Sequence, residues 1–227
     1  MRPQAQTEVL LRQIYFTGIQ ALPAVSASGL FIGLIIILLI TSLAGTSSGS
    51  AITKILLWLS LRELGPFFTS LIILTRSGTA ISTELATMKL NRELFYLEAM
   101  GIKPEDYLIK PRLAGVMISS VVLTIYFQLF TLFGGLYLAS LLSHIPFSEY
   151  GEAIIANFSF QELIVSFSKS LVFGLAIAGL SIWQGLSVKS APTEIPQRAT
   201  KAVATGLFSL FLLDGIINLL VTFLKSA

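Results

Sequence analysis

Charged side chains inside otherwise apolar runs are the residues of this chain that could do chemistry. Arg62 and Glu63 are adjacent and directly precede Leu64, Gly65 and Pro66. Ionisable groups within a membrane span are costly to bury and usually face protein or water. Opposite charges beside a helix break could hold a zwitterionic or anionic head group. They could equally pair with each other or with a neighbouring helix, or extend to the membrane interface.

Asp214 is a second such charge, near the middle of the last apolar run. It could line a polar path or accept a hydrogen bond from another helix, and we favour the structural bond. His144 is the only histidine and has no second ligand at metal-binding spacing, so a metal or catalytic role is not expected.

Motifs of catalysis are missing from the sequence. It contains no phosphate-binding loop of the form Gly-x-x-x-x-Gly-Lys-Ser/Thr, so the chain is not an ATP-binding subunit. It has no cysteine, which excludes thiolate metal sites, and no serine–histidine–acid constellation stands out. We therefore expect a non-catalytic protein without a metal or cofactor of its own.

The composition is that of a membrane protein. Of the 227 residues, 54% are hydrophobic and 12% are charged, whereas soluble domains have about 25% charged residues. The mean hydropathy is +0.83. The apolar runs are long and continuous rather than alternating, which favours helices over a membrane barrel. The expected fold class is an all-α integral membrane protein.

Helices must position these charges, and the pattern predicts one interfacial helix and five transmembrane helices. Residues 1–20 form the interfacial helix, with Leu11 and Tyr15 on one face and Arg12 on another; an extension of the first span is the alternative. Gly65 and Pro66 should bend or break the second span. The predicted spans are 24–43, 52–75, 113–142, 163–186 and 202–224.

Residues 77–112 form a charged cytoplasmic region between the second and third spans. Within it, Asn91 is a candidate N-cap and Gly101 a candidate stop, with Pro104 beyond, so a short helix is expected between them. The length of this region and its own helix favour a docking surface for a cytosolic partner over an ordinary solvated connection.

Basic residues indicate the orientation. With five spans, two loops fall on the same side as Arg2 and Arg12, and the other side has only Lys54, Lys169 and Lys225. The N-terminus should therefore be cytoplasmic and the C-terminus on the far side. The net charge is +3, and we interpret the distribution of the charged residues as information on membrane topology rather than as a sign of nucleic-acid binding. The basic residues of the two loops are Arg76, Lys89, Arg92, Lys103, Lys110, Arg112, Lys189, Arg198 and Lys201.

Several stretches together resemble the MlaE/YrbE permeases, the membrane subunits of ABC transporters that work with MCE proteins. They occur in the family's order and cover nearly the whole chain. The stretches are 28–33 (SGLFIG), 61–66 (LRELGP), 76–80 (RSGTA), 84–88 (ELATM), 97–102 (LEAMGI), 111–112 (PR) and 198–203 (RATKAV). The loop at 189–196, KSAPTEIP, departs from the glycine-rich sequence of many relatives.

The resemblance implies a single permease domain over 1–227 that forms a homodimer in the inner membrane of a double-membrane bacterium. The family moves phospholipids or related lipids between inner and outer membranes and so affects outer-membrane lipid asymmetry. A cytosolic MlaF-like ATPase that binds ATP and Mg²⁺ and a periplasmic MlaD-like MCE protein are the implied partners. A STAS-type regulatory subunit is a further candidate.

The resemblance also suggests roles for individual residues. Arg62 and Glu63 match the polar pair near the family's lipid cavity. The region that presses on the ATPase would contain Glu84, Glu93, Glu98 and Gly101, and Asp214 matches an acidic position to which no role is assigned.

Two rival functions come from other classes. An ion-coupled secondary transporter would use Asp214 or Glu63 as a protonatable site and would work without an ATPase. A membrane-embedded lipid enzyme would need a catalytic constellation that the sequence lacks.

Overall fold

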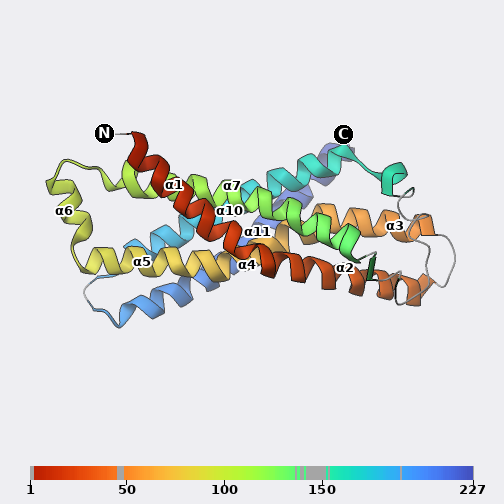
Figure 1. The fold of residues 1–227 in the computed structure, drawn as a ribbon, viewed down its shortest axis with the longest axis horizontal. Helices are drawn as coiled ribbons and strands as arrows, with labels where there is room; N and C mark the ends of the chain where they lie inside the picture. The colour runs from red at the N-terminus through yellow and green to blue at the C-terminus, as the bar shows by residue number, and fades with distance from the viewer. Residues whose placement is uncertain are drawn as a thin grey trace. The chain divides into compact units, whose positions relative to one another are not determined.

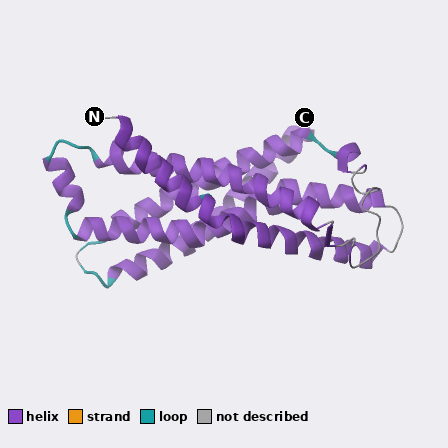
Figure 2. Cartoon of the chain, in the orientation of Figure 1, coloured by secondary structure: helices purple, strands orange, loops and turns teal. Residues whose placement is uncertain are grey.

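The computed structural model describes residues 3–44, 49–135, 137–138, 141, 152, 154–189 and 191–226. Within these ranges every regular element is helical and there is no strand (Figure 2). The all-α prediction is therefore confirmed. His144 and the end of the expected third span at Leu142 lie outside the described residues.

In the described part of the chain, five helical runs are long and apolar enough to cross a membrane, as expected. The second run continues to Leu90 and the fifth begins at Glu194, so both are longer than the predicted spans 52–75 and 202–224. The second continues because Ile81 and Leu85 are buried on one side of it, where it packs against the fifth run. The runs are Thr7–Leu39, Lys54–Leu90, Glu105–Gly134, Phe160–Leu186 and Glu194–Phe223.

Figure 1 labels the main helices along the chain. The first run contains α1 (Pro3–Thr17), η1 (Ile19–Ala21) and α2 (Leu22–Ala44). The second contains α3 (Gly49–Trp58), η2 (Leu59–Leu64), α4 (Gly65–Ile73), η3 (Leu74–Gly78) and α5 (Thr79–Leu90). Next come α6 (Glu93–Ala99), η4 (Glu105–Ile109), α7 (Lys110–Leu129), η5 (Phe130–Gly134), α10 (Phe160–Leu186) and α11 (Glu194–Ser226).

The expected interruption at Gly65 and Pro66 is a widened turn in a helix that continues. Pro66 has no N–H, and a proline ring crowds the carbonyl four residues earlier, here that of Arg62. The N–H of Gly65 instead donates to the carbonyl of Ser60, five residues back, and η2 is accordingly a π-helical segment. Such segments are rare and occur frequently at functional sites.

The short helix in the charged region is α6, but its predicted N-cap is wrong. Asn91 is the C-cap of α5, because α5 continues to Leu90. Arg92, in the left-handed conformation with φ 59°, precedes α6. The expected stop is confirmed: Gly101 has φ +76°, which glycine adopts without the strain a Cβ would cause.

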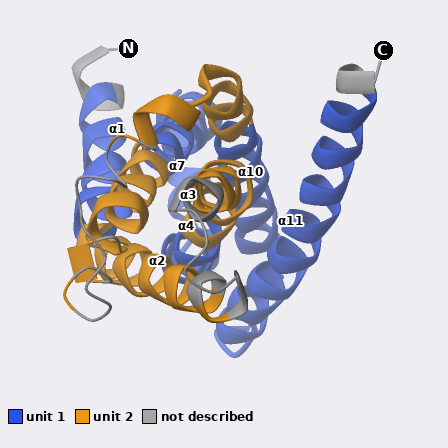
Figure 3. Ribbon diagram, turned by 90° about the vertical axis from the view of Figure 1, so that its right-hand side faces the viewer, with its two compact units in different colours: residues 1–21, 70–121, 169–227 blue, residues 22–69, 122–168 orange. Residues whose placement is uncertain are grey.

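The chain divides into two compact units (Figure 3). The first comprises residues 1–21, 70–121 and 169–227, and α5 packs against α11 in it. The second comprises residues 22–69 and 122–168. In the second, α2 contacts η5 at backbone distance: a Cβ on Gly33 would lie 2.2 Å from the carbonyl oxygen of Thr131.

Candidate functional site

Arg62 is buried in the second unit, with only 8% of the residue exposed. Its Nε lies 3.3 Å from Oε1 of Glu63, and its Nη1 lies 4.0 Å from Oε2 of Glu162. The guanidinium also lies over the ring of Trp58, 5.7 Å from the ring centroid. Arg62 therefore pairs with its neighbour and with a second helix, and it does not extend to the surface.

Glu162 is a member of this cluster that the sequence reasoning missed. It lies in the first turn of α10, at the edge of the fourth apolar run. A charged residue at the start of a helix is ordinarily solvated, yet the side chain of Glu162 is only 12% exposed. One cation thus faces two carboxylates, a set that could bind both a phosphate and an ammonium group.

Gln128 of α7 stabilises the π-helical turn that carries Arg62. Its Nε2 donates to the carbonyl of Leu61 at 3.2 Å and to Oγ of Ser166 at 2.6 Å. Gly65 permits this approach, since a Cβ there would lie 2.9 Å from Nε2 of Gln128. The position of Arg62 therefore depends on a glycine, a proline and a buried amide.

Asp214 forms an ion pair within the first unit, as the expected structural bond requires. Its Oδ1 accepts a hydrogen bond from Nζ of Lys169 at 2.8 Å. Its Oδ2 accepts one from Nδ2 of Asn218 at 3.2 Å. Lys169, counted above among the basic residues of the far side, is fully buried within α10. It is therefore held by a carboxylate inside the protein and says nothing about orientation.

The four residues assigned to ATPase coupling lie on different elements. Glu93 and Glu98 lie on α6, and Gly101 follows it. Glu84 lies on α5, where its Oε1 accepts a hydrogen bond from Nη2 of Arg112 at 2.7 Å. The structure therefore places three of the four on or beside one short helix, and ties the fourth to the start of α7.

Helix α6 has no buried residue and exposes large apolar side chains. Phe95 is 64% exposed, Tyr96 59% and Met100 66%. Apolar groups gathered on one exposed element are typical of interaction surfaces. Sequence reasoning chose the charged residues of this helix and missed its aromatic ones.

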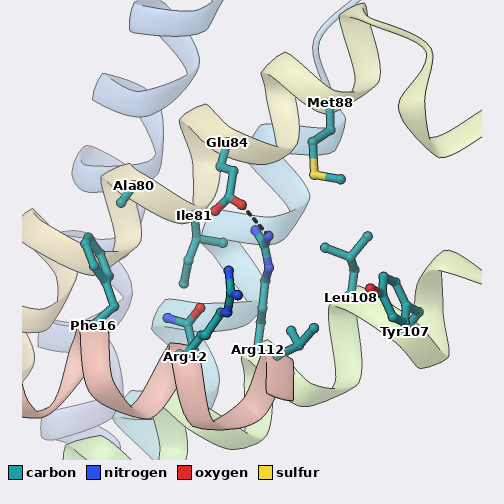
Figure 4. Close-up of a pocket in the computed structure, with 11 residues that line it drawn as sticks. Arg12, Phe16, Ala80, Ile81, Glu84, Met88, Tyr107, Leu108 and Arg112 are labelled. Atoms are coloured by element: carbon teal, nitrogen blue, oxygen red, sulfur yellow. Dashed lines mark hydrogen bonds and ion pairs between the residues drawn. The ribbon is translucent and has the colours of Figure 1, made fainter. Parts of the chain in front are cut away.

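A cavity of about 370 Å³ lies between α1, α5 and the segment from η4 to α7 (Figure 4). Arg112 and Glu84 lie on facing sides of it and are joined across it by their ion pair. Arg12 and Phe16 extend into it from α1. The complete lining is Val9, Arg12, Gln13, Phe16, Ala80, Ile81, Glu84, Met88, Tyr107, Leu108 and Arg112.

Among the described residues, no group of three or more His, Asp or Glu side chains could hold a metal ion.

Residues 10–220 match the family model described as "Permease MlaE". The chain is 28% identical to the intermembrane phospholipid transport system permease protein MlaE of Haemophilus influenzae, with 92% of this chain and 81% of that protein aligned. It is 25% identical to a probable ABC transporter permease protein, ycf63, of Pyropia yezoensis, over 95% of this chain and 82% of that one. A probable ABC transporter permease of Rickettsia typhi is 27% identical, over 89% and 79%.

Proposed function

This chain belongs to the MlaE permease family, and we propose that it is the membrane subunit of an ABC transporter that moves phospholipids or related lipids between membranes. The observation that carries the proposal is the family match over residues 10–220. The five apolar helical runs agree with it. The name of the Haemophilus influenzae relative supplies the substrate class. ATP hydrolysis would take place in a separate subunit, with ATP and Mg²⁺ bound there.

The lipid head group would bind at Arg62, Glu63 and Glu162. Arg62 is held by carboxylates from its own helix and from α10, and its buried Nε donates to no acceptor within hydrogen-bond geometry. A phosphate oxygen could take that donor, and a head-group ammonium could approach the carboxylates. A π-helical turn, a glycine and a proline hold Arg62 in this position, which gives a lipid-binding guanidinium a fixed direction.

Helix α6 would dock on the ATPase. The apolar side chains of Phe95 and Tyr96 in this helix and of Met100, its C-cap, are exposed. Glu93 and Glu98 lie close to them in sequence. Glu84 is tied to Arg112 and would transmit force from α5 to α7 rather than contact the ATPase.

The remaining assembly follows the family. Two copies of the chain would form the permease, with a periplasmic MCE protein and, as a further candidate, a STAS-type subunit. The chain would lie in the inner membrane with its N-terminus cytoplasmic and its C-terminus periplasmic. The basic residues of the regions 76–112 and 189–201 support this orientation.

The ion-coupled alternative loses support from the ion pairs. Asp214 is bound to Lys169 and Glu63 lies beside Arg62, so each carboxylate proposed for ion coupling is already paired with a cation of this chain. The first test of the proposal is native mass spectrometry of the tagged protein purified in mild detergent. Two copies with two ATPase subunits and retained phospholipid would support it, and transport in vesicles lacking any ATPase would contradict it.

The head-group site is tested by Arg62→Ala, with Lys54→Ala as the matched control because Lys54 is an exposed cation of the same unit. We expect Arg62→Ala to bind phospholipid about tenfold more weakly, because a charge-assisted hydrogen bond is lost. About tenfold more lipid should then be needed to saturate the variant. Lys54→Ala should behave like the native protein. Equal lipid retention by both variants, at unchanged thermal stability, would refute the assignment of Arg62.

The docking surface is tested by Phe95→Ser together with Met100→Ser, and by Lys201→Ser as a control at an exposed position on α11. The double variant should lose co-purification of the ATPase while keeping its bound lipid. Full recovery of the ATPase with the double variant would contradict docking at α6.

A further inference from the structure

The cavity between α1, α5 and α7 contains a buried cation that is only half satisfied. Arg112 is 5% exposed. Its Nη2 donates to Glu84, but its Nη1, which is also buried, has no hydrogen-bond partner. Guanidinium donors that are shielded from water are nearly always paired. The unused donor at the wall of a cavity therefore indicates an acceptor that the chain itself does not supply.

The other charges around this cavity favour an anion. Arg12 extends into it from α1, on the same side as Arg112 in the view of Figure 4. Its Nη2 lies 2.8 Å from Oε1 of Glu8, one turn away on the same helix. The carboxylate of Glu84 is already bound by Arg112. The residues that line the cavity therefore include two cations and one carboxylate, while Glu8, the partner of Arg12, lies outside the lining. Guanidinium groups bind phosphate oxygens in a planar, directional way.

An apolar groove adjoins the cavity along α1. Leu11, Ile14, Tyr15 and Ile19 line it, and Arg12 and Phe16 line both the groove and the cavity. Leu11 is 60% exposed, Tyr15 54% and Ile19 52%. A polar cavity that opens onto an exposed apolar groove fits an amphiphile with an anionic head and a hydrocarbon tail.

We infer that this cavity binds the phosphodiester head group of an anionic phospholipid from the surrounding bilayer, with an acyl chain along the apolar groove of α1. Nη1 of Arg112 and the donors of Arg12 that do not face Glu8 would bind the phosphate, while Glu84 keeps Nη2 of Arg112. This site shares no residue with the cluster at Arg62, so the bound lipid is a resident of the fold and not the transported one.

A lipid held here would control the position of α1. The C-terminal end of α1 and the following η1 are already tied to the second run. Nη2 of Arg76 donates to Oε1 of Gln20 at 2.7 Å, and the guanidinium of Arg76 lies 5.6 Å from the ring centroid of Phe16. Phe16 also lines the cavity. A head group bound between Arg12 and Arg112 would therefore fix α1 against α5 and α7 by a second contact.

The test compares Arg112→Gln, Glu84→Gln and the control Lys103→Gln, which removes an exposed cation outside the cavity. The purified complex is titrated with phosphatidylglycerol in phosphatidylcholine micelles, and bound lipid is counted by native mass spectrometry. Arg112→Gln should bind phosphatidylglycerol about tenfold more weakly, because one charge-assisted pair of bonds is lost. Glu84→Gln should bind it more tightly, because a competing carboxylate is removed. Lys103→Gln should match the native protein.

The pair of variants at one ion pair separates binding from folding. Both lose the Arg112–Glu84 ion pair, so equal weakening of lipid binding in both would show a structural effect and overturn the inference. Inorganic phosphate is titrated in parallel. If phosphate alone displaced phosphatidylglycerol at equal concentration, the site would be one for free phosphate, and the inference would also fail.

Retention of the lipid transported by the complex is measured with Arg62→Ala in the same preparation. Loss of that lipid with the phosphatidylglycerol titration unchanged would keep the two sites distinct.

Discussion

The ion pair between Lys169 and Asp214 allows a quantitative test, because its two partners are buried to different extents. The side chain of Lys169 is fully buried, whereas that of Asp214 is 22% exposed, and Nζ and Oδ1 lie 2.8 Å apart. Removing one partner of a buried pair costs about 3–5 kcal/mol, since a charge remains in a poor solvent. The loss of stability should be larger for the substitution that leaves the more deeply buried charge without a partner.

Asp214→Asn removes the carboxylate from a fully buried ammonium, and we expect the free energy of unfolding to fall by about 3 kcal/mol. That corresponds to a change of roughly 100-fold in the unfolding equilibrium constant. Lys169→Met leaves a carboxylate that is partly exposed and still accepts a hydrogen bond from Asn218. The expected loss there is smaller, about 2 kcal/mol. The double variant should lose less than the sum of the two, by about 3 kcal/mol.

The assay is reversible unfolding of the purified protein in mixed micelles with increasing sodium dodecyl sulfate, followed by tryptophan fluorescence. Lys201→Met is the matched control, an exposed lysine of α11 that should change stability little. Additive losses in the double variant would refute the pairing. A larger loss in Lys169→Met than in Asp214→Asn would refute the argument from burial.

Three further changes test the packing that positions the candidate sites. Gly33→Ala should lower stability by about 2 kcal/mol in the same unfolding assay, because its Cβ would lie 2.2 Å from the carbonyl oxygen of Thr131; an unchanged midpoint would contradict backbone contact between α2 and η5. Gln128→Leu should lower it by about 2 kcal/mol by removing two buried hydrogen bonds, and should weaken lipid retention at Arg62; native lipid retention would show that the amide does not position that residue. Arg76→Ala should change stability by less than about 1 kcal/mol. Amide hydrogen exchange in α1 should nevertheless rise, because the hydrogen bond from Arg76 to Gln20 is lost; unchanged exchange would count against that link.

The apolar runs could be located from the sequence because bilayer thickness imposes a length on them. The ends of the helices that contain these runs could not be located, because packing of one helix on another decides where a helix stops. Charged and polar residues between 77 and 90 predicted an exit from the membrane region. The same stretch contains Ile81 and Leu85 on one face, and burial of that face continues the helix to Leu90. Asn91 then ends one helix instead of beginning the next.

The candidate site could be predicted in part for a related reason. Arg62 and Glu63 are conspicuous because they lie together inside an apolar run. Glu162 and Lys169 lie near the start of the fourth run, where charges are ordinarily solvated, and nothing local distinguishes them. Only the fold brings Glu162 towards Arg62 and Lys169 to Asp214.

The buried cations of the described residues follow one rule that sequence patterns do not contain. They are Arg62, Arg112 and Lys169, and each pairs with a carboxylate on a different helix: Glu162 for the first, Glu84 for the second and Asp214 for the third. Apolar side chains packing in lipid favour many registers about equally, because lipid tails are as apolar as the helix surfaces. A buried charge excludes every register in which its partner is out of reach, since the unpaired state costs several kcal/mol.

This reasoning predicts that the double variant with a reversed pair, Lys169→Asp with Asp214→Lys, is less stable than the native protein. Reversal would put the lysine on the partly exposed side and the carboxylate at the fully buried position, where it would lose the hydrogen bond that Nδ2 of Asn218 donates to Asp214. Full recovery in the unfolding assay would show that charge alone, and not the matched length and burial of the two side chains, sets the register.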